Sequence, residues 1–230
     1  MGQKKYRDKT GLFVAEGPKL VGELIQAAFS PHSIFTTEPS TTTISGQQEI
    51  SEAELKKVSF LKTPNKVLGI FHKPAKERLE NTDLTVVLDD IQDPGNLGTI
   101  IRLCDWFGVA QLVCSPKTAD CYNPKVIQAT MGSIARVRVE YHDLEMYLSN
   151  VSVPVYGAFM DGNDVYGQSL PQKAIVVLGN EGQGISAEIE SRVTRRIAIP
   201  QYGKAQAAES LNVATAGAIL LSEFRRATGK

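Results

Sequence analysis

From residue 84 onward, short apolar runs alternate with amphipathic stretches, and this alternation limits the folds that the chain can adopt. The predicted strands cover residues 84–89, 111–114, 136–140, 153–159, 175–179 and 196–199. Helices are predicted in most of the connections and after the last strand, over residues 96–107, 124–131, 143–149, 186–192 and 210–226. Strands that alternate with helices form parallel sheets covered by helices on both faces. The sequence therefore predicts an α/β fold for this part of the chain.

The segment that joins the first of these strands to the first helix reads Asp93-Pro-Gly-Asn96. The Pro-Gly pair marks a turn, and the side chain of Asn96 can cap the helix by accepting a hydrogen bond from a free backbone N–H. Arg102 follows about two turns later, on roughly the same face of the helix. Ligands of open α/β sheets bind at the carboxyl ends of the strands, so we predict an active-site edge here.

Two later segments repeat this arrangement of strand, polar loop and helix start. Residues 175–186 (IVVLGNEGQGIS) contain a glycine-rich loop, and residues 197–200 (IAIP) precede a helix that opens at residues 209–214 (ESLNVA). Three such junctions fit one composite site at one edge of the sheet. The glycine-rich loop follows a late strand and lacks the Gly-Lys-Ser/Thr ending of a phosphate-binding loop, which argues against a dehydrogenase or an NTPase.

Taken in order, the motifs DPGNLGTIIR, LGNEGQGIS and IP…ESLNVA resemble those of the SpoU (TrmH-like) family of RNA ribose 2′-O-methyltransferases, in the SPOUT superfamily. The resemblance covers residues 84–226. It implies that a methyl group passes from S-adenosylmethionine to a ribose 2′-hydroxyl of rRNA, with tRNA as the less favoured substrate. It also implies a homodimer, and a deep trefoil knot in the C-terminal parallel-sheet domain, which no pattern of strands and helices predicts.

The resemblance implies roles for individual residues of the three loops. Arg102 is the expected catalytic group; because a guanidinium stays protonated, we expect it to bind phosphate and to stabilise a developing alkoxide. The other catalytic candidates are Asn96, Glu181, Ser210 and Asn212. The cofactor-binding candidates are Leu178, Gly179, Asn180, Gly182, Ile199, Pro200, Ser210, Leu211 and Asn212. Plain helix capping by the asparagines and the serine, and a solvated loop glutamate, are the structural alternatives.

Residues 1–75 predict a smaller α/β module, separated by a charged linker from a catalytic domain at residues 82–230. Within it, residues 1–9 form a basic arm that we expect to be poorly ordered or to lie on a partner, and Ser51-Glu-Ala-Glu54 resembles a capping box. Residues 1–80 hold 12 Lys and Arg against nine Asp and Glu, a basic surplus that suits RNA docking. The module resembles the ribosomal-protein-like substrate-binding domain that often precedes a SpoU catalytic domain. A module that only supports dimer formation or solubility is the alternative.

Composition excludes fewer functions than the motifs do. The net charge is zero, so the chain as a whole carries no nucleic-acid signal. The three cysteines form no Cys-x-x-Cys pair, which is typical of reduced thiols in a cytoplasmic protein and argues against a metal site. No apolar run approaches the length of a transmembrane helix, so we expect no membrane partner. A non-catalytic RNA-binding or ribosome-assembly factor on the same fold is the alternative function; an absent arginine, a broken glycine loop or a lost Ser-Leu-Asn triplet would favour it.

Overall fold

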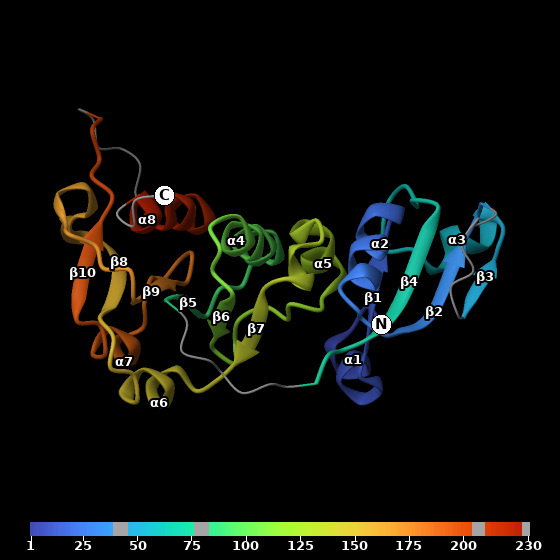
Figure 1. Ribbon diagram of the computed structural model, residues 1–230, viewed down its shortest axis with the longest axis horizontal. Coiled ribbons are helices and arrows are strands. Elements are labelled where there is room, and N and C mark those ends of the chain that lie inside the picture. Colours follow the sequence, from blue (N-terminus) through green and yellow to red (C-terminus); the bar gives the residue numbers. More distant parts are fainter. Residues whose placement is uncertain (39–45, 76–82, 204–209, 227–230) are drawn as a thin grey trace. The chain divides into compact units, whose positions relative to one another are not determined.

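The computed structural model describes residues 1–38, 46–75, 83–203 and 210–226, and the chain divides into two compact units (Figure 1). Unit 1 comprises residues 1–77 together with residues 120–136, and unit 2 comprises residues 78–119 and 137–230. Each unit has its own sheet. Among the described residues, no helix is long and apolar enough to span a membrane.

Unit 1 is a mixed sheet with helices packed on it. Its strands are β1 (Leu12–Glu16), β2 (Pro31–Thr36), β3 (Gln47–Glu49) and β4 (Val67–His72), in the order β1-β4-β2-β3. Strand β4 runs antiparallel to both β1 and β2, and β3 runs parallel to β2. Its helices are α1 (Lys4–Thr10), α2 (Pro18–Gln26), α3 (Glu52–Val58) and α5 (Pro124–Thr130), and a 3-10 turn, η1 (Ser133–Ala135), follows α5. The predicted α/β module is confirmed.

Helix α3 begins with the capping box that the sequence predicts. The backbone N–H of Glu54 donates to Ser51 Oγ (3.2 Å), and the backbone N–H of Ser51 donates to Glu54 Oε2 (2.9 Å). Two of the free donors at the helix start are satisfied in this reciprocal way. Strand β3 has no such signal, because its sequence Gln-Gln-Glu contains no apolar residue, and the sequence did not predict it.

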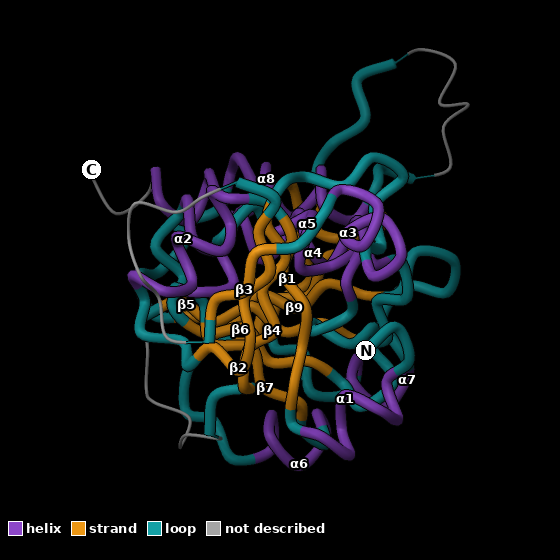
Figure 2. Tube along the Cα trace, turned by 90° about the vertical axis from the view of Figure 1, so that its right-hand side faces the viewer, coloured by secondary structure: helices purple, strands orange, loops and turns teal. Residues whose placement is uncertain are grey.

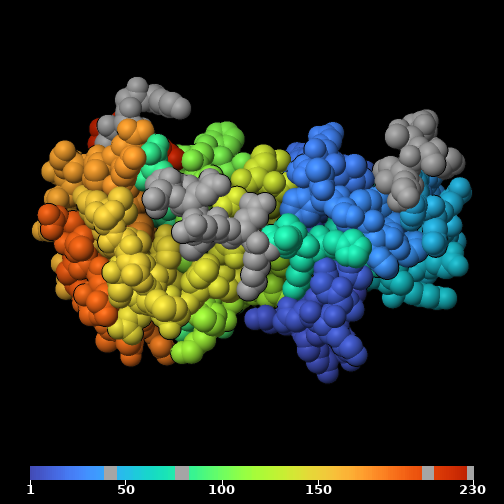
Figure 3. Space-filling model, turned by 60° about the horizontal axis from the view of Figure 1, so that its bottom comes forward, coloured from blue at the N-terminus to red at the C-terminus, as the bar shows by residue number. Residues whose placement is uncertain are grey.

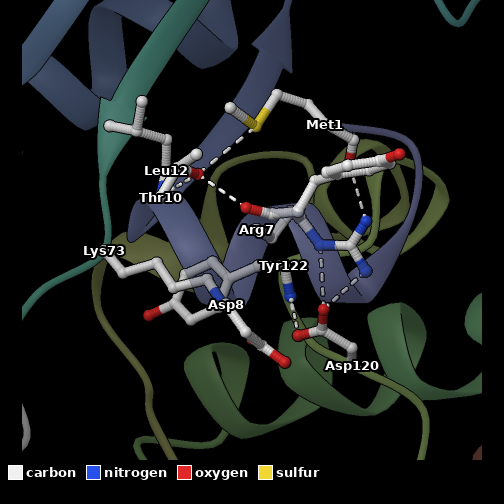
Figure 4. A network of polar contacts seen from close by, with 9 residues as sticks. Met1, Arg7, Asp8, Thr10, Leu12, Lys73, Asp120 and Tyr122 are labelled. Carbon is white, nitrogen blue, oxygen red and sulfur yellow. Dashed lines mark hydrogen bonds and ion pairs between the residues drawn. The ribbon is translucent and has the colours of Figure 1, made fainter.

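The N-terminal arm forms a helix, so the expectation that residues 1–9 are poorly ordered is wrong; that they lie on a partner stays a prediction. Lys4–Thr10 forms α1, which is the dark blue lobe in the space-filling view (Figure 3). Its side chains are exposed except for Arg7, which is 1% exposed. The Arg7 guanidinium donates to Asp120 Oδ2 from Nε (2.9 Å) and Nη2 (2.6 Å), and to the Met1 carbonyl from Nη1 (Figure 4). A pattern of surface charges could not reveal a buried carboxylate 113 positions away in the sequence.

Residues 120–136 lie in the middle of the region predicted to be catalytic, yet they pack in unit 1. The Tyr122 ring lies 4.9 Å from the Phe13 ring, measured between centroids, and α5 contacts β1. The backbone N–H of Tyr122 also donates to Asp120 Oδ1 (3.0 Å), so the carboxylate that pairs with Arg7 is held from both sides. The functional division into residues 1–75 and 82–230 stays a prediction, which these compact units do not test.

Unit 2 contains the parallel sheet that the sequence predicts. Its strands are β5 (Leu84–Asp89), β6 (Gln111–Cys114), β7 (Arg138–Tyr141), β8 (Val155–Asp164), β9 (Ala174–Gly179) and β10 (Arg195–Ala198). The strand order is β10-β8-β9-β5-β6-β7, and every pairing among the described residues is parallel. Its helices are α4 (Pro94–Trp106), α6 (Leu144–Ser149), α7 (Ala187–Glu190) and α8 (Val213–Arg226), with a 3-10 turn, η2 (Val165–Gly167), after β8. The trefoil knot is not established by this order and stays a prediction.

Most predicted elements end within three residues of the observed ones, and β8 differs most. Its pairing with β10 jumps from Gly157 to Asn163 while β10 advances by one residue, from Arg196 to Ile197. Residues 158–162 therefore bulge out of the ladder. The bulge extends β8 to Asp164, five residues beyond its predicted end. A bulge is set by the neighbouring strand and leaves no clear signal in the sequence.

The sheet of unit 2 is covered on both faces. Strands β5 and β9 are apolar over nearly their whole length, as expected for central parallel strands that are buried on both sides. On one face, Val87, Val113 and Val177 pack against α6 and α7. Helices α4 and α8 contact each other on the opposite face, an arrangement on which Figure 1 and Figure 2 agree. This core fixes the loops that leave the carboxyl ends of β5, β9 and β10.

Candidate functional site

A cavity of about 640 Å³ opens in unit 2 beside the carboxyl ends of β9 and β10. Its walls come from the glycine-rich loop, from the residues after β10, from the start of α8 and from the bulge of β8. All of the predicted cofactor-binding residues line this cavity: Leu178, Gly179, Asn180, Gly182, Ile199, Pro200, Ser210, Leu211 and Asn212. The structure thus brings together residues that two separate motifs contribute.

The glycine-rich loop is a tight hairpin closed by Asn180. Asn180 and Gly184 exchange two backbone hydrogen bonds of 2.9 Å, and Asn180 Oδ1 accepts from the backbone N–H groups of Gly182 (2.9 Å) and Gln183 (3.1 Å). At Gly179, a Cβ atom would lie 2.2 Å from the backbone of Gly184. Only glycine fits there, because backbone atoms cannot yield as a side chain can. The loop therefore presents its backbone to the cavity at a fixed position.

A chain of hydrogen bonds joins the three predicted loops at the mouth of the cavity. Asn212 Nδ2 donates to Asn96 Oδ1 (2.9 Å), and Asn96 Nδ2 donates to Glu181 Oε1 (2.9 Å). Asn212 Oδ1 accepts from the backbone N–H groups of Ala214 (3.0 Å) and Thr215 (3.2 Å), so this oxygen caps α8. The capping bonds fix the amide orientation of Asn212, and through it the orientation of Asn96. Asn212 therefore caps α8 and also joins the hydrogen-bonded chain beside the cavity.

Glu181 is held as a carboxylate. Partial burial by itself would raise its pKa, but hydrogen bonds from the side chain of Asn96 and from backbone N–H groups, including those of Gln92 and Asp93, lower the pKa below its usual value. The backbone donors of Gln92 and Asp93 each lie 3.3 Å from a carboxylate oxygen. Glu181 is exposed, but the segment that joins β5 to α4 donates to its carboxylate from Gln92, Asp93 and Asn96. The carboxylate is therefore held by a neighbouring loop as well as exposed to solvent.

Asn96 does not cap α4, contrary to the prediction. Asp93 is the capping residue: its Oδ1 accepts from the backbone N–H of Asn96 (2.8 Å), and Pro94 occupies the first turn. Proline is favoured there because its missing N–H would have no partner. The amide of Asn96 is consequently available for Glu181 and Asn212.

Arg102 lies apart from this network. It is exposed on α4, it does not line the cavity, and within the described residues it makes no hydrogen bond or ion pair. The expected common face with Asn96 is wrong, because six residues fall short of two full helical turns by roughly 120°. Ser210 lines the cavity from the segment before α8, which begins at Val213 rather than at the predicted residue 210.

Two features of the site were missed from the sequence. The bulge of β8 adds Ala158, Phe159 and Met160 to the wall of the cavity. Asp90 adopts a positive φ of 58°, and its carbonyl accepts from Asn180 Nδ2 (2.7 Å). Ser115 Oγ donates to the Asp90 carboxylate and accepts from the Asp90 N–H (2.9 Å), which holds this turn beneath the glycine-rich loop. Aspartate tolerates the left-handed conformation better than most residues, but no motif marked the position.

Comparisons with known proteins agree on one family. The sequence profile described as "SpoU rRNA Methylase family" matches residues 83–222, and that of the "MRM3-like substrate binding domain" matches residues 1–69. The 23S rRNA (guanosine(2553)-2′-O)-methyltransferase RlmP of Bacillus subtilis is 33% identical over 234 residues, which cover 96% of this chain and 92% of the relative.

Two solved structures share the fold over nearly the whole chain. A putative RNA methyltransferase of the TrmH family from Porphyromonas gingivalis is 40% identical, with a TM-score of 0.88, and the match covers 97% of this chain and 93% of the other. The AdoMet-bound rRNA methyltransferase from Sinorhizobium meliloti is 29% identical, with a TM-score of 0.85 and coverage of 98% and 91%. Both the sheet of unit 2 and the preceding module therefore occur together in these relatives.

Proposed function

The chain belongs to the SpoU rRNA methylase family, and we propose that it transfers a methyl group from S-adenosylmethionine to a ribose 2′-hydroxyl of rRNA. The observation that carries this function is the cavity of about 640 Å³, whose walls hold every predicted cofactor residue and whose lining residues Glu181 and Asn212 are bridged by Asn96. The relative from Bacillus subtilis, named for this reaction on 23S rRNA, matches almost end to end.

The cavity fits S-adenosylmethionine in size and in chemistry. Its volume is typical of pockets for cofactors of this size. Leu178, Ile199 and Leu211 supply apolar surface for an adenine, and the hairpin closed by Asn180 supplies backbone groups for polar contacts. When bound, the cofactor supplies an electrophilic methyl group on a sulfonium. We propose that the loops hold it chiefly through backbone groups, because glycine at position 179 allows close approach.

The polar chain at the mouth orients the groups that meet the ribose. Glu181 keeps a negative charge at neutral pH, and its bonds to Asn96 and to two backbone N–H groups hold the carboxylate in one orientation. Positioning of a reacting hydroxyl contributes several kcal/mol to catalysis, about 7 or more in well-oriented systems. We assign this positioning to Asn96, Glu181, Ser210 and Asn212. Arg102 stays protonated and is assigned to the phosphate and to the alkoxide that develops as the proton leaves.

We propose a homodimer in which Arg102 of one protomer completes the site of the other. Arg102 is exposed and unpaired within the described residues, and it does not line the cavity of its own chain. Helices α4 and α8 pack together, and Trp106 at the end of α4 is 84% exposed, so a large apolar side chain on the helix that carries Arg102 is available to a partner.

The dimer proposal has a direct test by mixing variants. Arg102→Ala and Asn212→Ala are each expected to be inactive alone. If each site combines two protomers, a co-expressed mixture contains heterodimers with one intact site, and activity returns. If Arg102 serves its own chain, every chain in the mixture carries a defect and no activity returns. Size-exclusion chromatography of each variant checks that it still assembles.

We assign the N-terminal module to substrate binding and place the domain division at residues 75–82. The trefoil knot is assigned to the segment that forms the cofactor cavity. The match of residues 1–69 to a substrate-binding profile supports the first assignment. We propose that the protein acts in the cytoplasm, as expected if it modifies rRNA in the way that its relative from Bacillus subtilis is named for.

The function is tested first by cofactor binding. Isothermal titration of the full chain with S-adenosylmethionine is expected to give one site per chain, and Gly179→Ala is expected to abolish it because the new Cβ meets backbone. Gly167→Ala is the matched control, since a Cβ at Gly167 meets nothing within 4 Å. Binding that survives in Gly179→Ala would place the cofactor outside this cavity.

A further inference from the structure

Unit 1 contains a second cavity, of about 340 Å³, that the methyl-transfer site does not use. It is formed by β1, by the loop after α3 and by α5, and β1 and α5 are neighbours within unit 1 (Figure 1). The residues that line it are Val14, Glu16, Phe60, Leu61, Pro124, Lys125, Gln128 and Ala129. Segments matched by the substrate-binding profile and by the methylase profile meet in its walls.

An exposed aromatic ring forms one wall of this cavity and is held in place. Phe60 is 48% exposed, so its ring is accessible to a ligand in the cavity. Its backbone N–H donates to Glu16 Oε1 (2.8 Å), and Ser59 Oγ donates to the other carboxylate oxygen. Glu16 is 5% exposed, so a buried carboxylate fixes the loop that carries the ring. Both oxygens of Glu16 are thereby engaged, and the carboxylate is turned to the loop.

Two polar side chains that line the cavity have no partner within the described part of the chain. The Gln128 amide and the Lys125 ammonium make no hydrogen bond or ion pair there. An amide offers both a donor and an acceptor, which suits the edge of a nucleobase, and an ammonium suits a phosphate. They lie on α5 three residues apart, and so face the same side of the helix.

We propose that this cavity binds one unpaired nucleotide of the RNA substrate, an inference that rests on the proposed function of the chain. An aromatic face for stacking, an amide for the base edge and a cation for the phosphate are the groups with which proteins hold single-stranded RNA. Val14, Leu61 and Ala129 supply the apolar surroundings that a base requires. The Glu16 carboxylate is engaged by Ser59 and Phe60, which leaves the Lys125 ammonium as the lining charge without a partner among the described residues, and this favours a nucleotide over a cationic ligand. An apolar peptide would leave both the amide and the ammonium unused.

Single substitutions in the full chain test the cavity. The substrate is 23S rRNA transcribed in vitro, and the readouts are KM for the RNA, kcat and the affinity for S-adenosylmethionine. Phe60→Ala is expected to raise KM for the RNA about tenfold, within the range measured for loss of one base–aromatic stack, while kcat and cofactor affinity stay unchanged. Phe60→Tyr keeps the ring and is expected to keep the wild-type KM. Gln128→Ala is expected to raise KM in the same way as Phe60→Ala.

Tyr6→Ala is the matched control. Tyr6 is an aromatic residue of unit 1 that is 49% exposed, nearly the same as Phe60, and it does not line the cavity. The proposal is overturned if Phe60→Ala and Gln128→Ala have the same KM for the RNA as Tyr6→Ala while methyl transfer is normal. That result would leave the proposed function intact.

Photocrosslinking separates this proposal from the function on which it rests. A transcript that contains 4-thiouridine is expected to crosslink to a peptide that contains Phe60 or Gln128, and this readout needs no methyl transfer. If the crosslink forms but no RNA is methylated, the cavity stands and the proposed function fails. If the transcript crosslinks only to peptides that contain neither Phe60 nor Gln128, the nucleotide binds elsewhere and the proposal is wrong.

Discussion

The buried ion pair between Arg7 and Asp120 makes a sharp prediction about stability. The two side chains are 2% and 9% exposed, and the guanidinium donates twice to the same carboxylate oxygen (Figure 4). In Asp120→Ala the guanidinium remains buried with the Met1 carbonyl as an acceptor, and it cannot become neutral by losing its proton. Breaking a buried pair from one side costs about 3–5 kcal/mol. With a urea m-value of about 2 kcal/mol/M, the unfolding midpoint falls by about 1.5–2.5 M.

Urea unfolding followed by far-UV circular dichroism measures this loss, and two variants control it. Lys73→Ala removes an ion pair with Asp8 in the same unit, but these side chains are 19% and 53% exposed, so the expected cost is about 1 kcal/mol or less. The double variant Arg7→Met with Asp120→Leu removes both charges and is expected to recover most of the stability, because no charge is left buried. The reasoning is refuted if Asp120→Ala loses no more free energy of unfolding than Lys73→Ala. It is also refuted if the double variant loses as much free energy of unfolding as the two single substitutions, Arg7→Met and Asp120→Leu, lose in total.

Three further outcomes follow from the site and the core. Gly179→Ala is expected to lose S-adenosylmethionine binding and to unfold at a lower urea concentration than Gly167→Ala, because its new Cβ would meet the backbone of the hairpin; titration and urea unfolding will report both. Hydrogen bonds lower the pKa of Glu181 below its usual value, so its charge is present at neutral pH and is lost only as pH falls through that lowered pKa. The loss of kcat in Glu181→Gln is therefore expected to be constant between about pH 6 and 8, and a loss that varies with pH there would contradict this assignment. Burial raises the pKa of the Cys104 thiol to about 12, so a thiol reagent is expected to leave Cys104 unmodified in the folded protein and to modify it in urea, as mass spectrometry will show.

The sequence predicted the parts of the site that local rules control. Strand ends, turns and the Ser-Leu-Asn segment placed residues 178–182 and 210–212 at one edge of a parallel sheet, and the structure places both segments in the wall of one cavity. This worked because the carboxyl ends of parallel strands meet at the same edge whatever the details of packing. The capping box at Ser51 was equally local, since all its partners lie within four residues.

The features that the sequence could not predict depend on residues far apart in the chain. Asn96 bonds to Glu181 and Asn212, which lie 85 and 116 positions away, and its predicted capping role went to Asp93 instead. The partner of Arg7 is 113 positions away, so a residue taken for part of a solvated arm is a buried cation. Such pairings are decided by how the elements pack, and no window of sequence contains both members.

The most direct test of the central claim is the chemical position of the transferred methyl group. The full chain is incubated with S-adenosylmethionine carrying a labelled methyl group and with rRNA or ribosomal particles from cells that lack the protein; the RNA is then digested to nucleosides and analysed by mass spectrometry. We expect one 2′-O-methylated nucleoside, reduced about 100-fold or more in Arg102→Ala, as for the loss of a group that stabilises a developing oxyanion. Label on a base, or no label from a protein that binds the cofactor normally, would contradict this function; the second result would favour a non-catalytic RNA-binding factor.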